Sequence, residues 1–254
     1  MSYLNTKPLI YGLSRHPVEA EIELIVDYPA HIARMLIEGQ IDVGLVPVAI
    51  IPELEESHII TDYCIGCNGA VDSVAIFSEQ PMESISTIIL DYQSRTSVLL
   101  SRVLMQEYWK KEVDWKDAKG EEYRQQIKDD VAGVVIGDRA LEQKKISTYM
   151  YDLGLAWKNH TGLPFVFAAW ISNKTLPASF IKAFNEANRM GLDNLEEVVA
   201  LEDHDHVALR KYYTENISYQ LNAEKKKGLA HFLSKIKLLK SNKTALSSEL
   251  PAKK

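Results

Sequence analysis

Polar side chains gather at the start of the chain, ahead of any apolar run. Segment 2–9 reads SYLNTKPL and carries a hydroxyl, a carboxamide and an ammonium group on Ser2, Asn5 and Lys7. Pro8 disfavours helix in the residue before it, so the segment predicts a loop. Neutral donors on such a loop can hydrogen-bond a ligand. Asn5 either faces that ligand or serves only as a turn residue, which is common for asparagine.

A second polar group follows the strand expected over residues 85–91. Ser94, Thr96 and Ser97 surround Arg95 where a helix is expected to begin. The start of a helix can bind an anion through its free backbone N–H groups. A single hydroxyl is enough to cap the start of a helix. Three hydroxyls therefore predict a cradle for a carboxylate. Arg95 either pairs with that carboxylate or points to solvent.

Further candidates lie next to the expected strands. Ser73 stands near the start of a strand expected over residues 71–78 and could donate to a ligand or to its own backbone. Arg139 follows the strand expected over residues 131–136 and is equally ambiguous. Four carboxylates lie at strand ends, and any could be a general base if burial raised its pKa. They are Asp42, Asp91, Asp138 and Asp152.

The two cysteines, Cys64 and Cys67, form an isolated Cys-x-x-Cys. A structural zinc needs four ligands, and no second pair follows at a suitable spacing. A thioredoxin-type pair would stand between a strand and a helix, whereas Gly66 and Gly69 suggest a turn. We interpret both residues as small buried thiols in a reducing compartment and expect no metal site.

Composition narrows the class of protein. The chain has 254 residues, of which 46% are hydrophobic and 25% charged, as in ordinary globular proteins. A net charge of −6 argues against a nucleic-acid partner. No apolar run reaches the roughly 18 residues of a membrane span, and no secretory signal is apparent. We therefore expect a cytoplasmic protein with a small-molecule ligand.

Apolar periodicity predicts strands that alternate with helices. A strand over residues 21–26, a helix over 31–38 and a strand over 41–48 form the first unit. The second unit has the strands at 85–91 and 131–136, separated by a helix and a charged connection. Such alternation favours a parallel sheet covered on both faces.

The remaining chain adds one strand and then helices. The strand is expected over residues 164–171, and the helices over 180–190, 195–201, 207–221 and 223–239. These elements predict two α/β lobes with a ligand cleft between them. The first lobe takes residues 1–83 and 164–240, the second takes 84–163, and 241–254 form a flexible tail.

Several motifs together resemble the chorismate dehydratase family of the futalosine route to menaquinone. The opening SYLN-x-x-PL is the most specific of them. The others are DVGLVP at residues 42–47, VDSV at 71–74, DYQSRTS at 91–97 and IGDRAL at 136–141. The resemblance covers about residues 2–172 and implies the two-lobed fold of type II periplasmic binding proteins.

The resemblance implies that water is lost from chorismate to give 3-[(1-carboxyvinyl)oxy]benzoate, with no cofactor. It implies catalytic roles for Asn5 and Ser73. The implied substrate-binding residues are Ser2, Val46, Ser94, Arg95, Thr96, Ser97, Asp138 and Arg139. A carboxylate of the substrate could serve as the base, because a protein carboxylate beside a dianion would be costly.

Two points in the sequence leave alternatives open. Members of the family carry a strand of about half a dozen residues before the SYLN loop, so we expect that the recorded start is truncated. The same fold also hosts non-catalytic small-anion binding proteins and sensors. A third alternative is the sister enzyme that forms dihydroxynaphthoate from cyclic futalosine.

Overall fold

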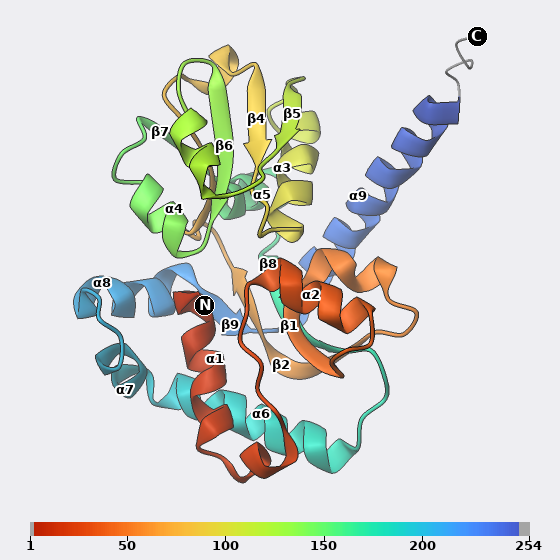
Figure 1. The fold of residues 1–254 in the computed structure, drawn as a ribbon, viewed down its shortest axis with the longest axis vertical. Helices are drawn as coiled ribbons and strands as arrows, with labels where there is room; N and C mark the ends of the chain where they lie inside the picture. The colour runs from red at the N-terminus through yellow and green to blue at the C-terminus, as the bar shows by residue number, and fades with distance from the viewer. Residues whose placement is uncertain (1–2, 249–254) are drawn as a thin grey trace.

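Two separate β-sheets organise the protein. The structure, a computed structural model, describes residues 3–248, with side chains through residue 239. Figure 1 shows each sheet in its own lobe, so the predicted two-lobed α/β fold is confirmed. No helix within residues 3–248 combines the length and the apolar character that crossing a membrane requires.

The first lobe is built on a four-stranded sheet with strand order β1-β8-β2-β9, in which all neighbours are antiparallel. Its strands are β1 (Val43–Pro47), β2 (His58–Cys67), β8 (Phe165–Ser172) and β9 (Ser218–Gln220). Helices from both ends of the chain pack around this sheet (Figure 1). They are α1 (Lys7–Tyr11), α2 (Pro29–Ile37), α6 (Ala178–Asp193), α7 (Leu195–Ala200), α8 (His206–Lys211) and α9 (Ala223–Ser248).

The second lobe holds a five-stranded sheet with strand order β5-β4-β6-β3-β7. Its strands are β3 (Val74–Ser78), β4 (Thr87–Leu90), β5 (Asp114–Asp117), β6 (Val131–Ile136) and β7 (Tyr149–Asp152). Three helices, α3 (Thr96–Glu107), α4 (Asp138–Gln143) and α5 (Leu153–Thr161), accompany it. Only the β4–β5 and β4–β6 pairs are parallel, so the prediction of a parallel sheet is wrong for most of the molecule.

The chain enters the second lobe earlier than the sequence suggested. β3 pairs with β6 and β7, although the predicted boundary at residue 83 placed residues 74–78 in the first lobe. Its five residues are all buried, so periodicity alone could not assign the strand to either sheet. At the other end, α9 continues to Ser248 through part of the predicted tail, while residues 249–254 lie outside the described residues.

β2 is the largest element that the sequence pattern did not predict. It is a ten-residue strand that contains both cysteines, where a turn was expected. A Cβ on Gly66 would lie 2.5 Å from the Phe165 carbonyl oxygen, so glycine here permits close approach of β8. A register shift between Ile65 and Gly66 lies at the same place. Gly66 therefore marks a strand irregularity instead of a turn.

The cysteine thiols should be unreactive in the folded protein. Both are free and buried, which confirms the predicted burial of the two thiols. Burial raises the pKa of Cys64 to about 11 and that of Cys67 to about 12, against an ordinary value of 9.0. We expect a thiol-specific disulfide reagent at pH 8 to label neither residue until denaturant is added. Rapid labelling of the native protein would contradict this expectation.

The same shifts predict a pH dependence of stability. The folded chain keeps both thiols protonated above the pH at which the unfolded chain releases its protons. The contribution of the two protonated thiols to the free energy of unfolding is therefore complete below about pH 9, and it is lost as the pH rises further. Urea unfolding of the wild type and of Cys67→Ala at pH 8 and pH 10 measures it: the wild type should lose more stability than the variant over this interval.

The predicted helix over residues 207–221 is interrupted. α8 ends at Lys211, a π-helical turn covers Tyr212–Asn216, and β9 follows. Ile217, Tyr219 and Leu221 are buried, so their alternation was the available signal for a strand. β9 adds to the free side of β2.

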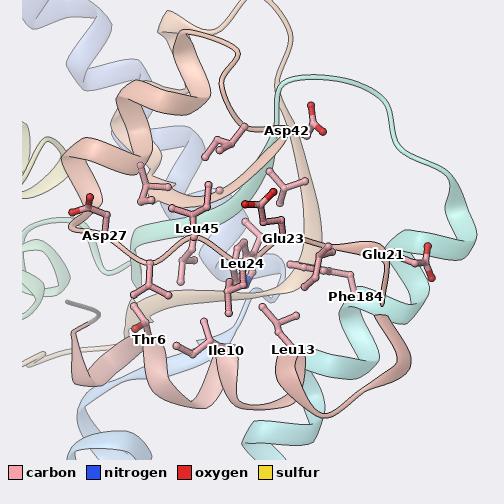
Figure 2. Close-up of a pocket in the computed structure, with 18 of the residues that line it drawn as sticks. Thr6, Ile10, Leu13, Glu21, Glu23, Leu24, Asp27, Asp42, Leu45 and Phe184 are labelled. Atoms are coloured by element: carbon pink, nitrogen blue, oxygen red, sulfur yellow. The ribbon is translucent and has the colours of Figure 1, made fainter. Parts of the chain in front are cut away.

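The strand predicted over residues 21–26 is absent, because this segment has no partner. Residues 22–28 have no regular secondary structure and pair with no other strand. A groove of about 500 Å³ separates them from β1, which is an edge strand. Figure 2 shows the side chains of Ile10, Leu13 and Leu24 lining this groove, and Leu24 is 44% exposed. An unpaired strand edge such as that of β1 can accept one more strand.

The resemblance led us to expect a strand before the SYLN segment, and the groove allows this expectation to be tested directly. Tyr3, the first described residue, lines the groove, so a segment joined to the N-terminus could reach it. An added segment of about six residues with alternating apolar side chains should raise the free energy of unfolding by roughly 3 kcal/mol. A Gly/Ser extension of equal length is the control. Equal urea midpoints for the two extended proteins would contradict the prediction.

The opening segment is held in place by a close helix crossing. A Cβ on Gly191 of α6 would lie 1.8 Å from the Pro8 carbonyl oxygen. A Cβ on Gly12 would lie 2.0 Å from the Ala187 carbonyl oxygen. Both glycines thus allow backbone contact between α6 and the segment that contains α1. Since only Thr6 separates Asn5 from α1, this crossing also fixes the position of the opening loop.

Candidate functional site

The opening loop lies between the two lobes. Leu4–Thr6 forms a 3-10 turn and α1 begins at Lys7, so the loop is shorter than predicted. Pro8 is tolerated because it lies in the first turn of α1. The Leu4 backbone N–H donates to Asp138 Oδ1 of the second lobe at 3.0 Å. This bond joins the loop of one lobe to the helix start of the other.

Asn5 and Ser73, the two predicted catalytic residues, share one buried partner. Asn5 is 8% exposed and Ser73 is fully buried. The Tyr212 hydroxyl donates to Ser73 Oγ at 2.7 Å, and the Asn5 side chain is the other hydrogen-bond partner of this phenol. The structure therefore connects Asn5 from the first lobe with Ser73 from the second.

One polar atom of this cluster has no partner. Asn5 Oδ1 is buried and accepts no hydrogen bond from the described residues. Leaving such an acceptor unsatisfied costs about 1–3 kcal/mol. A ligand that donates a hydrogen bond to Asn5 Oδ1 would remove this cost. The Asn5 main chain is by contrast fixed, since its carbonyl accepts from the Tyr219 hydroxyl at 3.0 Å.

The backbone around Ser73 is strained and tightly held. Asp72 has φ 63, an uncommon value for a residue with a side chain. Its N–H donates to Asp152 Oδ2 at 2.7 Å, and its carboxylate pairs with Lys144 at 3.0 Å. The Ser73 carbonyl accepts from the Gly137 N–H at 2.8 Å. These contacts fix the main chain of Ser73 directly before β3 begins.

Gly137 brings the opening loop against the start of α4. It has φ 66, and a Cβ there would lie 2.5 Å from the Tyr3 ring. Asp138 follows it and receives the Leu4 N–H. Burial raises the pKa of the Asp138 carboxyl, with the Leu4 hydrogen bond acting in the opposite direction. In this structure Asp138 holds the loop, and its predicted contact with substrate stays a prediction.

The hydroxyls at the start of α3 already have structural partners. Ser94 Oγ accepts from the Ser97 N–H at 3.1 Å, and Thr96 Oγ1 accepts from the Ala49 N–H at 3.2 Å across the lobes. Arg95 pairs with Glu53 at 3.0 Å near the surface. Capping and lobe contact thus explain two of the three hydroxyls. The carboxylate cradle stays a prediction.

Arg139 is neutralised by the protein. It contacts Asp91 Oδ2 at 2.8 Å and Glu121 Oε1 at 2.7 Å, and it donates to the Tyr3 hydroxyl at 3.0 Å. Asp91 also accepts from the Tyr123 hydroxyl at 3.0 Å. Two carboxylates on one guanidinium leave it little net charge for a substrate anion. In this structure Arg139 ties Tyr3 to the second lobe, and its predicted contact with substrate stays a prediction.

The remaining predicted residues are less informative. Val46 is fully buried in β1, and Ser2 lies outside the described residues. Lys7 pairs with Glu202 at 2.8 Å. Among residues 3–239, no group of three or more His, Cys, Asp or Glu side chains is placed to hold a metal ion.

Tyr212 and Tyr219 both contact Asn5, and neither was predicted from the sequence as a site residue. Tyr212 was assigned to a helix, and no local pattern distinguishes it from a core residue. Tyr219 belongs to the buried alternation of residues 217–221. Only the folding of the chain end back onto the opening loop brings these residues to the site, so sequence separation hides the arrangement.

Relatives of known name match nearly the whole chain. It is 25% identical to the chorismate dehydratase of Thermus thermophilus, with 89% of this chain and 94% of that protein covered. It is 27% identical to the chorismate dehydratase of Campylobacter jejuni, with 94% and 96% covered.

The fold also has solved counterparts. Protein AF1704 of Archaeoglobus fulgidus superimposes with a TM-score of 0.75 at 11% identity, covering 93% of this chain and 94% of that one. The periplasmic aliphatic sulphonate binding protein SsuA of Escherichia coli gives 0.57 at 14% identity, covering 94% and 90%. These likenesses agree with the predicted periplasmic-binding-protein-like fold. The family model described as menaquinone biosynthesis matches residues 1–237, so the chain belongs to this family.

Proposed function

We propose that this protein is a lyase that dehydrates chorismate to 3-[(1-carboxyvinyl)oxy]benzoate. The observation that carries the proposal is the unpartnered Asn5 Oδ1, which is buried and linked through Tyr212 to the Ser73 hydroxyl of the other lobe. An amide oxygen accepts a hydrogen bond and a hydroxyl can donate one. Together they match a substrate hydroxyl, which does both. The two named chorismate dehydratases support the choice of substrate.

The reaction needs little covalent chemistry from the protein. The C3–H bond and the C4–O bond of chorismate break, the ring becomes aromatic, and the lost proton and hydroxide together form one water. Ser73 would donate a hydrogen bond to the departing C4 oxygen, and Asn5 Oδ1 would accept one from the same hydroxyl. Donors aimed at developing negative charge lower the barrier to its departure.

A carboxylate of the substrate would serve as the proton acceptor. The half-buried carboxylates near Ser73 are already engaged: Asp138 accepts from the Leu4 N–H, and Asp152 accepts from the N–H groups of Val71 and Asp72. Asp42 pairs with Lys174 and is 65% exposed at its side chain. A neutral site beside a dianion also avoids the repulsion that a protein base would add.

The proposed activity can be tested with purified protein and chorismate. We expect an aromatic acid lighter by one water to appear faster than without protein, as followed by chromatography with mass detection. Saturable binding without turnover would instead favour a binding protein or sensor, a role that the fold shared with SsuA supports. If chorismate neither reacts nor binds, turnover of cyclic futalosine would identify the sister enzyme.

A further inference from the structure

We propose that Tyr212 is a positioning residue that sets the direction of the Ser73 hydroxyl, so that Ser73 acts as the donor to the substrate. This inference rests on the proposed function and deepens it. Tyr212 lies outside the motifs and outside residues 2–172, to which the resemblance is confined. It belongs to the C-terminal segment of the first lobe.

The hydrogen bond between the two hydroxyls has a defined polarity. A phenol is a stronger acid than an alcohol and is therefore the better donor to Ser73 Oγ. Burial raises the pKa of the Tyr212 phenol, so that its proton stays in place across the working pH range. Because Ser73 Oγ accepts this bond, the proton of Ser73 is directed elsewhere. An isolated serine hydroxyl could instead rotate between donor and acceptor orientations.

The Asn5 amide is ordered by the same phenol. The Asn5 side chain also interacts with the Tyr212 hydroxyl. Because Asn5 Oδ1 has no hydrogen-bond partner, this contact is made by the NH₂ group. The carbonyl Oδ1 is thereby left as the free atom. The chain of bonds runs from Asn5 through Tyr212 to Ser73, and it ends in one free acceptor and one free donor.

Local structure explains how Tyr212 reaches both residues. It is the first residue of the π-helical turn Tyr212–Asn216, and its carbonyl accepts from the Ile217 N–H at 3.0 Å. π-Helical turns are rare in proteins, and those that do occur often lie at functional sites. β9 starts directly afterwards, and the Tyr219 hydroxyl holds the Asn5 carbonyl.

Lys225 stabilises β9, the strand that follows the π-helical turn. It is 1% exposed, and its ammonium donates to the Gln220 carbonyl at 2.7 Å and also to the Ser218 carbonyl. The turn and the strand therefore hold Tyr212 and Tyr219 on one side of the site.

The adjacent Tyr213 provides a matched control for Tyr212. It is also buried, but its hydroxyl has no hydrogen-bond partner among the described residues. Tyr212→Phe and Tyr213→Phe thus remove the same atom from neighbouring residues. We expect Tyr212→Phe to lower kcat about tenfold with KM changed less than about twofold, because the bond it removes orients a group used in the chemical step. Tyr213→Phe should keep the wild-type kcat.

A double-mutant cycle with Ser73→Ala separates positioning from general damage. Once Ser73 has no hydroxyl, Tyr212→Phe should lower kcat by about threefold or less, because only the contact of Tyr212 with Asn5 remains to be lost. A tenfold loss in both backgrounds, or equal activities of Tyr212→Phe and Tyr213→Phe, would overturn the inference while leaving the proposed function intact. If wild-type protein does not dehydrate chorismate, both proposals fail. Circular dichroism and urea midpoints of all variants identify any that are misfolded.

Discussion

Asn5→Ala is expected to lower kcat for chorismate dehydration by about 100-fold or more, the usual effect of removing one preorganised hydrogen-bonding group at a reacting atom. The side chain supplies both the unpartnered Oδ1 and a bond to Tyr212. The loop itself should stay in place, because the Tyr219 hydroxyl binds the main-chain carbonyl of residue 5, which alanine retains. Steady-state kinetics of the purified variant measures the change.

Asn159→Ala is a suitable control for this substitution. Asn159 lies on the exposed surface of α5, so the same change of residue type there should leave kcat unaltered. Full activity of Asn5→Ala would mean that the unpartnered amide oxygen does not face the substrate. A loss of activity accompanied by a lower urea midpoint would instead mean that Asn5 is structural.

Gly191→Ala should strongly destabilise the protein and reduce its activity. The new Cβ would lie 1.8 Å from the Pro8 carbonyl oxygen, so the backbones of α1 and α6 must separate. Overpacking of this kind costs about 3 kcal/mol, which corresponds to a fall in Tm of roughly 6–12 °C for a chain of this size. Because only Thr6 separates Asn5 from α1, kcat should fall as well. Thermal unfolding and chorismate turnover measure the two effects.

Gly120→Ala is the matched control for Gly191→Ala. A Cβ at residue 120 would meet only the flexible Glu122 carboxylate, 2.8 Å away, which can move aside. Its Tm should lie within about 2 °C of the wild type. If Gly191→Ala behaved in the same way, the close crossing of α1 and α6 would not be what fixes the opening loop.

Sequence periodicity predicted the elements that are amphipathic or continuously apolar. The helix predicted over residues 31–38 corresponds to α2, where Ile32 and Leu36 are buried as expected. The strand predicted over 164–171 corresponds to β8. Such elements carry their own signal because one face or the whole segment must be buried.

Elements that depend on distant partners were not predictable in the same way. Residues 22–28 have strand-like composition but find no strand to pair with. β9 forms because β2 offers a free side, and Lys225 then binds two of its carbonyl groups. The membership of β3 in the second sheet is likewise a property of its neighbours.

The site shows the same division between local and distant information. Asn5 and Ser73 were predicted from a resemblance in the first part of the chain, and the structure links them through Tyr212. Neither residue's local sequence indicates a tyrosine more than 130 positions away from Ser73. Arg139 was ambiguous from sequence, and its two carboxylate partners are apparent only in the fold.

Chorismate that carries deuterium at C3 and heavy oxygen in its C4 hydroxyl group tests the central claim most directly. We predict that the purified protein converts it to 3-[(1-carboxyvinyl)oxy]benzoate without either label, and that the heavy oxygen appears in water. A product that retains the C3 deuterium or the C4 oxygen would contradict the proposed dehydration. So would recovery of unchanged doubly labelled chorismate from a correctly folded protein.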